Sequence, residues 1–266
     1  MTATDQIDLA ALNRALAGTR FARRVQHFAS VDSTNTLLLE AAATGAPEGT
    51  VYVADEQTAG RGRGGHQWHS AAGDGLYVSA LIRAPLPLAQ ALWISLATGL
   101  AAQQAIQQTA HITADIRWPN DLLLNTPQGS RKVGGILVET AIEGEQLRYA
   151  VIGIGINVNH PEFPADLATQ ATSLRIEAGH TISRTTLLTE LLRALDLELT
   201  QLESDDPTLL TRFTTASTWV RGKRVHVAES GGYTGVTDGL DPHGFLQIAG
   251  DDGLRHTVLS GGVREA

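Results

Sequence analysis

Apolar side chains recur with a helical period in several segments of the chain. One segment keeps leucine at the spacing of helix turns, at Leu188, Leu191, Leu192, Leu195, Leu199 and Leu202. Ser183 is placed to cap this helix at its start. Residues 33–45 begin with Ser-Thr-Asn and end at a glycine, so both ends of a second helix are marked. Further helices are predicted over residues 8–18 and 88–109.

Strand patterns separate these helices. Residues 76–84 alternate, with one apolar face made by Leu76, Val78, Ala80 and Ile82. Strands are also predicted over residues 21–30, 50–58, 132–144 and 146–159, and residues 114–125 predict a strand, a turn at Pro119 and Asn120, and another strand. The order shows no regular βαβ alternation. We therefore expect an α+β fold around a mainly antiparallel sheet.

The chain changes character near Ser217. From Arg221 onward, short apolar segments are broken by GGY, TDG, DPHG and GDDG. This spacing predicts a small all-β unit built of hairpins. We expect two domains, residues 1–216 and residues 217–266.

Composition narrows the classes of function. The chain has 266 residues, of which 42% are hydrophobic and 18% charged, as is typical of globular proteins. A net charge of −8 makes a general nucleic-acid binder a poor candidate. The absence of cysteine excludes disulfides, thiolate metal sites and thiol nucleophiles. The N-terminus lacks the pattern of a signal peptide and no apolar run reaches the length of a membrane span, so we expect a cytoplasmic protein with no membrane partner.

Residues 57–70, QTAGRGRGGHQWHS, concentrate glycine and positive charge in one loop. The glycines match G-x-G-x-x-G, but no helix start follows, as a dinucleotide-binding fold would need. Glycines let a backbone close over a ligand, and Arg61 and Arg63 suit phosphate or carboxylate. Trp68 offers a flat face on which a base can stack. The loop predicts an anion site, and the alternative is a solvated surface loop.

Other segments carry residue types found at ligand sites. The strand over residues 151–159 has one apolar face, made by Ile152, Ile154, Ile156 and Val158. Its other face is made of glycine and asparagine, at Gly153, Gly155, Asn157 and Asn159. Such a face favours close approach of a ligand. Asp121, at the RWPND turn, is a candidate magnesium ligand, and Lys132 precedes a buried strand. The structural alternatives are a strand weakened by glycine, a turn aspartate and a solvated lysine.

Taken in order, these motifs resemble the biotin protein ligases. The resemblance rests on STN (33–35), QTAGRGR followed by Trp68, RWPNDLLL, KVGGILVE and GIGINVN, and extends to GVTDGLDPHGFLQI in the tail. It implies a catalytic domain of the biotin/lipoate ligase type, related to class II aminoacyl-tRNA synthetases, plus a small SH3-like β barrel. About thirty residues precede STN, so the chain resembles the short form without a DNA-binding domain, and no nucleic-acid partner is expected.

The resemblance also implies a reaction. Biotin and Mg·ATP give biotinyl-5′-AMP and pyrophosphate, and a lysine of a biotin carboxyl carrier protein domain then takes the biotin and releases AMP. Biotin as substrate, ATP and Mg²⁺ are therefore the expected ligands. The alternatives are a lipoate–protein ligase of the same fold and a sensor that binds biotin or its adenylate without transferring it. A weak homodimer is a further expectation.

Site roles follow by matching positions. The implied biotin-binding residues are Ser33, Thr34, Asn35, Gln57, Gly60, Arg61, Gly62, Arg63 and Lys132. Those implied for ATP or the adenylate are Arg61, Arg63, Trp68, Arg117, Asn120, Lys132 and Asn157. Lys132, Arg63 and Asp121 are the implied catalytic residues, and Asp121 is the implied Mg²⁺ contact. Ser33 and Thr34 also fit a helix cap.

The chain departs from the family pattern in two places, and its glycine–arginine loop has a predicted motion. His66 stands where the family commonly carries arginine, and Gly64 and His66 make the loop less basic. Arg117 stands where lysine is common, which keeps the charge and changes the geometry. We expect the loop to be disordered or open without ligand and ordered over the adenylate, where it would exclude water.

Overall fold

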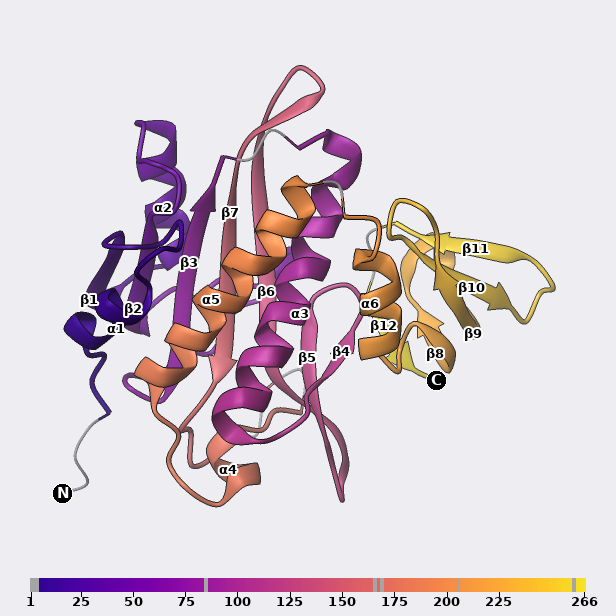
Figure 1. Ribbon diagram of the computed structural model, residues 1–266. Coiled ribbons are helices and arrows are strands. Elements are labelled where there is room, and N and C mark those ends of the chain that lie inside the picture. Colours follow the sequence, from indigo (N-terminus) through magenta and orange to yellow (C-terminus); the bar gives the residue numbers. More distant parts are fainter. Residues whose placement is uncertain (1–4, 84–85, 165–166, 168–169, 205, 260–261) are drawn as a thin grey trace.

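A seven-stranded sheet lies at the centre of the larger part of the computed structural model (Figure 1). The structure describes residues 5–83, 86–164, 167, 170–204, 206–259 and 262–266. The strands of this sheet are β1 (Val25–Val31), β2 (Val51–Gln57), β3 (Gly75–Ile82), β4 (Asp115–Arg117), β5 (Asp121–Thr126), β6 (Gly129–Glu143) and β7 (Gln146–Asn157). Their spatial order is β1-β2-β3-β7-β6-β5-β4. β1 and β2 pair in parallel, and the remaining neighbours are antiparallel. The predicted mainly antiparallel sheet is confirmed.

Helices cover both faces of this sheet. The described helices are α1 (Leu9–Ala15), α2 (Thr34–Ala43), α3 (Ala91–Ala110), α4 (Leu174–Ala178), α5 (Arg184–Glu203) and α6 (Leu209–Ala216). The long helices α3 and α5 pack against each other across one face (Figure 1). Helix α2 packs against β3 and β7 with a separate group of buried side chains that includes Leu38, Leu81 and Val151. No helix in the described part of the chain is both long and apolar enough to cross a membrane.

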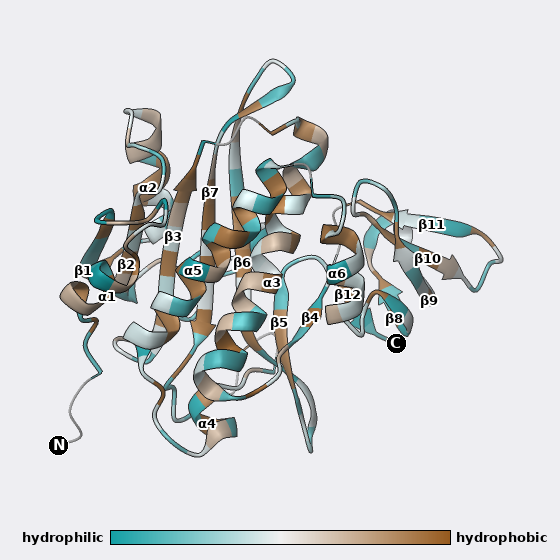
Figure 2. Cartoon of the chain, in the orientation of Figure 1, coloured by the Kyte–Doolittle hydropathy of each residue, from teal (hydrophilic) through white to brown (hydrophobic). Residues whose placement is uncertain are grey.

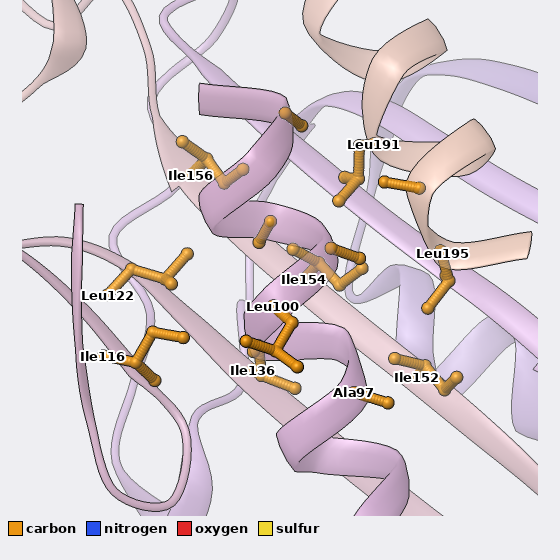
Figure 3. Close-up of a cluster of buried hydrophobic side chains, with 14 of the residues drawn as sticks. Ala97, Leu100, Ile116, Leu122, Ile136, Ile152, Ile154, Ile156, Leu191 and Leu195 are labelled. Atoms are coloured by element: carbon orange, nitrogen blue, oxygen red, sulfur yellow. The ribbon is translucent and has the colours of Figure 1, made fainter. Parts of the chain in front are cut away.

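The main core lies between the sheet and the two long helices. Figure 3 shows Ile152, Ile154 and Ile156 of β7 among leucines of α3 and α5. All six leucines of the predicted period in α5 are buried, and the Ser183 hydroxyl accepts a hydrogen bond from the Thr186 amide, as a helix cap does. Figure 2 shows hydrophobic residues concentrated on the central strands β3 and β7. The predicted apolar face of β7 is confirmed.

The structure departs from or goes beyond the predicted local structure in three places. All eight residues of β3 are buried, because α2 also covers the face opposite the predicted apolar one. The first strand begins at Val25 rather than at residue 21, because the preceding residues form turns in which Arg23 adopts a φ of 59°. The short helices α4 and α6 were not predicted, since each spans only one or two turns.

The tail forms a separate antiparallel sheet of five strands. They are β8 (Arg221–Val227), β9 (Tyr233–Leu240), β10 (Leu246–Gly250), β11 (Arg255–Val258) and β12 (Val263–Glu265), in the order β11-β10-β9-β8-β12. The Trp118 indole donates a hydrogen bond of 2.9 Å to the carbonyl of Gly244, which fastens this sheet beside the larger one. The predicted all-β unit is confirmed, and the boundary at Ser217 stays a prediction.

Candidate active site

The start of helix α2 forms one wall of a narrow cavity, which we call the slot. The Ser33 hydroxyl caps the helix by accepting from the Thr36 amide at 3.4 Å. The Thr34 amide and hydroxyl both donate to Oε1 of Gln57, at 2.9 and 3.1 Å. The slot is lined by Ser33, Thr34, Asn35, Gln57, Arg61, Gly62, Arg63, Trp68, Tyr77, Val78, Asn120, Lys132, Gly135, Ile136, Leu137, Gly153, Ile154 and Gly155. Eight of the nine predicted biotin-binding residues therefore surround one cavity.

Gly60, the ninth predicted residue, lies at the base of the loop and does not line the slot. A Cβ atom at this position would come within 2.5 Å of the Trp68 carbonyl oxygen. The Gly60 carbonyl also accepts a hydrogen bond from the Trp68 amide at 2.9 Å. Gly60 thus permits a close approach of the two loop ends.

The glycine face of β7 receives two side chains of the protein itself. A Cβ atom on Gly153 would lie 2.3 Å from Oδ1 of Asn35, and one on Gly155 would lie 2.6 Å from the Trp68 indole nitrogen. The absence of these Cβ atoms lets Asn35 and Trp68 lie flat against the strand. The close approach to this face that we predicted for a ligand is therefore made by the side chains of Asn35 and Trp68. These two side chains in turn line the cavities.

The predicted asparagines hold neighbouring backbone. The Asn120 amide donates to the Ile136 carbonyl at 3.0 Å, and the Asn157 amide donates to the Thr172 carbonyl at 3.1 Å. Both side chains also line a second cavity beside the slot, which we call the wide cavity. Asn159 is engaged with Ile182 and lines neither cavity.

The glycine–arginine loop, residues 60–68, folds back on itself. Arg61 and Gln67 form a β-bridge, and the Gly62 amide donates to the His66 carbonyl at 2.7 Å. Gly64 and Gly65 turn the chain with φ values of 66° and 80°, a conformation that glycine adopts without strain. His66, where the family commonly has arginine, lines the wide cavity.

A cluster of three charged groups lies beside the slot. Lys132 Nζ is 2.6 Å from Oδ1 of Asp121, and an Arg117 nitrogen is 2.6 Å from Oδ2 of the same carboxylate. Burial raises the pKa of Asp121, but Lys132 and Arg117 more than offset it, so this pKa lies below its usual value. Lys132 Nζ also lies 5.3 Å from the centre of the Trp68 ring, and Arg117 lies 5.4 Å from that of Trp219.

Arg63 is the second arginine of the loop and faces both cavities. Burial lowers the pKa of its guanidinium, and the negative charges of Asp121 and Glu229 partly oppose that change. The side chain remains charged, because a guanidinium titrates far above neutral pH. It provides a cation aimed into the site.

The wide cavity has a volume of about 800 Å³, which is ample for a nucleotide-sized ligand. Gly262, Val263 and Arg264 of the tail sheet contribute to its wall, a contribution that no sequence motif indicated. The slot and the wide cavity share Gly62, Arg63, Trp68, Asn120 and Lys132. Six of the seven predicted ATP residues line the wide cavity, and Arg61 lies on the slot alone.

Comparison with known proteins agrees with this geometry. The model of the biotin/lipoate A/B protein ligase family matches residues 27–157. The biotin–[acetyl-CoA-carboxylase] ligase of Mycobacterium tuberculosis is 32% identical over 247 residues, which cover 90% of this chain and 88% of that protein. The chain belongs to the biotin/lipoate A/B protein ligase family.

Two further relatives extend the comparison. The bifunctional ligase/repressor BirA of Bacillus subtilis is 42% identical over 164 residues, so the match covers 61% of this chain and about half, 49%, of that relative. The solved biotin protein ligase of Aquifex aeolicus in complex with biotin and ATP superposes with a TM-score of 0.78 at 28% identity, covering 92% of this chain and 100% of that one. The predicted ligase fold, an α+β catalytic unit followed by an SH3-like sheet, is confirmed.

Proposed function

We propose that this protein is an ATP-dependent biotin protein ligase, which forms biotinyl-5′-AMP and transfers biotin to a lysine of a biotin carboxyl carrier domain. One observation carries the proposal: the slot and the wide cavity meet at Lys132. An acid bound in the slot and a nucleotide bound in the wide cavity would face each other across this ammonium group. Because the reaction uses ATP and a carboxylase carrier domain, we place it in the cytoplasm.

The slot suits the neutral, bicyclic end of biotin. Its ureido group has two N–H donors and a carbonyl acceptor, so it needs both kinds of partner. Ser33, Thr34, Asn35 and Gln57 supply hydroxyl and amide groups at the buried end. The apolar surfaces of Leu137 and Trp68, which lie on the slot side of the sheet, suit the remainder of the molecule.

Lys132 and Arg63 are the groups we assign to the first chemical step. In that step a carboxylate oxygen of biotin attacks the α-phosphorus of ATP, and pyrophosphate leaves. Two anions must approach each other, and a fixed ammonium group between them lowers that repulsion and stabilises the charge at phosphorus. Arg63 would hold the phosphate end from the loop.

The wide cavity would hold the nucleotide. Trp68 offers its ring to the adenine, while Arg117, Asn120 and Asn157 lie where they can contact the nucleotide. Mg²⁺ commonly binds through one or two carboxylates together with the phosphates of the substrate. Asp121 supplies a carboxylate at this cavity, and both of its oxygens are paired with Lys132 and Arg117. It is the protein group we propose to contact that ion, through the lone pairs that these two contacts leave.

The second step regenerates the site. The neutral amine of the carrier lysine attacks the carbonyl carbon of the adenylate, forming an amide and releasing AMP. The mixed anhydride is prone to hydrolysis, so the loop over residues 60–68 must exclude water until the carrier arrives.

The test is biotin-dependent release of pyrophosphate from Mg·ATP, followed by addition of a biotin carrier domain. Release followed by a mass increase of one biotin on the carrier lysine is the expected result. Release without transfer would favour the sensor alternative or another acceptor. Release with lipoate and none with biotin would move the protein to the lipoate ligases.

A further inference from the structure

Glu139 makes contacts that none of the assigned roles requires. It lies on β6 with a side chain that is 24% exposed, and it faces the loop that follows β2. The Arg61 guanidinium donates to both of its oxygens, at 2.8 and 3.1 Å. The Asn35 amide donates to the same carboxylate at 3.0 Å. One carboxylate therefore joins the loop to a wall of the slot.

The contact continues as a chain of polar groups along the floor of the slot. Ser79 Oγ lies 2.5 Å from Oδ1 of Asn35 and 2.8 Å from the Thr34 hydroxyl. The Thr34 hydroxyl donates to Gln57, and the Gln57 amide donates to the Ser70 hydroxyl at 2.9 Å. Ser70 in turn donates to the Trp68 carbonyl at 3.2 Å.

This series of hydrogen bonds begins at Arg61 and ends at Trp68, and these two residues lie at the two ends of the loop. The loop itself is braced internally by the Arg61–Gln67 bridge and the Gly60–Trp68 hydrogen bond. It can therefore move as one unit, and opening it at the Arg61 side requires breaking the contact with Glu139. Residues that we assign to biotin binding lie in the middle of this series of hydrogen bonds.

We propose that Glu139 is a positioning residue that holds the glycine–arginine loop closed over the slot and couples that closure to the biotin-binding side chains. This inference rests on the proposed function for the identity of the ligand. It divides the two loop arginines between two tasks. Arg61 has its charge compensated by Glu139 and anchors the loop, whereas Arg63 is the cation directed at phosphate.

The charge of Glu139 is central to this role. A bidentate pair between a guanidinium and a carboxylate is stronger and more directional than a contact between neutral groups. Glu139→Gln keeps the size of the side chain and one acceptor, but it loses the ion pair. The loop should then open more often, and an adenylate formed beneath it should escape more often before transfer.

Trypsin provides a readout that does not depend on activity, because cleavage after Arg61 and Arg63 requires the loop to leave its folded conformation and extend into the protease. In the intact protein with biotin present, the condition that favours the closed loop, Glu139→Gln should raise the initial rate of cleavage at these bonds about two- to fivefold, as expected for loss of a partly exposed ion pair. Glu143→Gln is the matched control, since Glu143 is exposed on the same strand. Glu139→Asp, which retains the charge, should fall between the wild type and Glu139→Gln.

A second readout concerns the fate of the intermediate. With biotin, Mg·ATP and a carrier domain, Glu139→Gln should release more biotinyl-5′-AMP or its hydrolysis products per carrier modified, with unchanged thermal unfolding. Equal cleavage of the loop in Glu139→Gln and Glu143→Gln would overturn the proposal. A wild-type protein that releases no pyrophosphate with biotin would instead overturn the ligase function, while the cleavage comparison would still decide the role of Glu139.

If Glu139→Gln unfolds at a lower temperature, Arg61→Gln tests the same pair from the loop side. Cleavage after Arg63 should then rise to the same extent, and the double variant should show no further increase. Additive effects in the double variant would mean that the two side chains act separately, which contradicts the proposal.

Discussion

Lys132 Nζ lies 2.6 Å from Oδ1 of Asp121, and the two residues come from neighbouring strands of the same sheet. Asp121 also accepts from Arg117, so the carboxylate holds two cations at fixed positions. The ammonium group of Lys132 is thereby placed where the slot and the wide cavity join, instead of extending into solvent. Such fixed placement is what electrostatic stabilisation of a transition state requires.

Replacement of Lys132 by alanine removes this cation. We expect biotin-dependent pyrophosphate release to fall by at least about 100-fold, the usual effect of losing one group that stabilises transition-state charge. Arg131→Ala is the matched control, because Arg131 is the adjacent basic residue and lines neither cavity. Turnover of Lys132→Ala at the wild-type rate would contradict the role assigned to the lysine.

Two glycines of β7 allow the two cavities to be perturbed separately. Gly153→Ala places a methyl group 2.3 Å from the Asn35 side chain and should weaken biotin binding. Gly155→Ala places one 2.6 Å from the Trp68 ring and should weaken ATP binding more than biotin binding. Calorimetric titration of each variant with each ligand separates these effects. The same loss for both ligands in both variants would show that the strand, and not the named side chain, is disturbed.

His160 should make stability depend on pH. Its side chain is buried, with 1% of its surface exposed, and burial lowers its pKa to about 4. The unfolded chain takes up a proton near pH 6.5 and the folded protein does not, so the contribution is fully present above pH 6.5 and is lost as the pH falls toward 4. The loss should reach about 3 kcal/mol at most.

Urea unfolding of the wild type and His160→Asn at pH 7, 5 and 4 measures this contribution. The variant should show the shallower dependence on pH. His180→Asn is the control, because His180 is exposed. If the profiles of wild type and His160→Asn run parallel across this range, His160 does not contribute in this way.

Leu195 tests the packing of helix α5 on the sheet. Its side chain has no exposed surface and lies among the buried groups of Figure 3. Leu195→Ala should lower the free energy of unfolding by about 2–5 kcal/mol through lost burial and the remaining cavity. Leu197, two positions later, is 51% exposed, so Leu197→Ala should change it by less than about 0.5 kcal/mol. Equal losses for both variants, measured by denaturant titration, would contradict this orientation of the helix.

Several elements can be predicted from signals between residues that are close along the chain. The alternation in β7 separated its isoleucine face from its glycine face, and Ser183 marked the start of α5. These signals are local, because a strand face repeats every second residue and a cap reaches only the next turn. The motifs around Lys132 and Asp121 likewise identified the family from their order along the chain.

The contacts between residues that are distant along the chain depend on the complete fold. Arg61 and Glu139 are 78 positions apart, and neither side chain carries a local signal of its partner. Their contact follows from the folded loop and the strand order β3-β7-β6, which brings β6 beside the slot. Helix α2 covers one face of β3 and α5 packs against the strand from the other side, so both faces are buried. Periodicity along one segment cannot encode such placement, because it reports a face and not what covers that face.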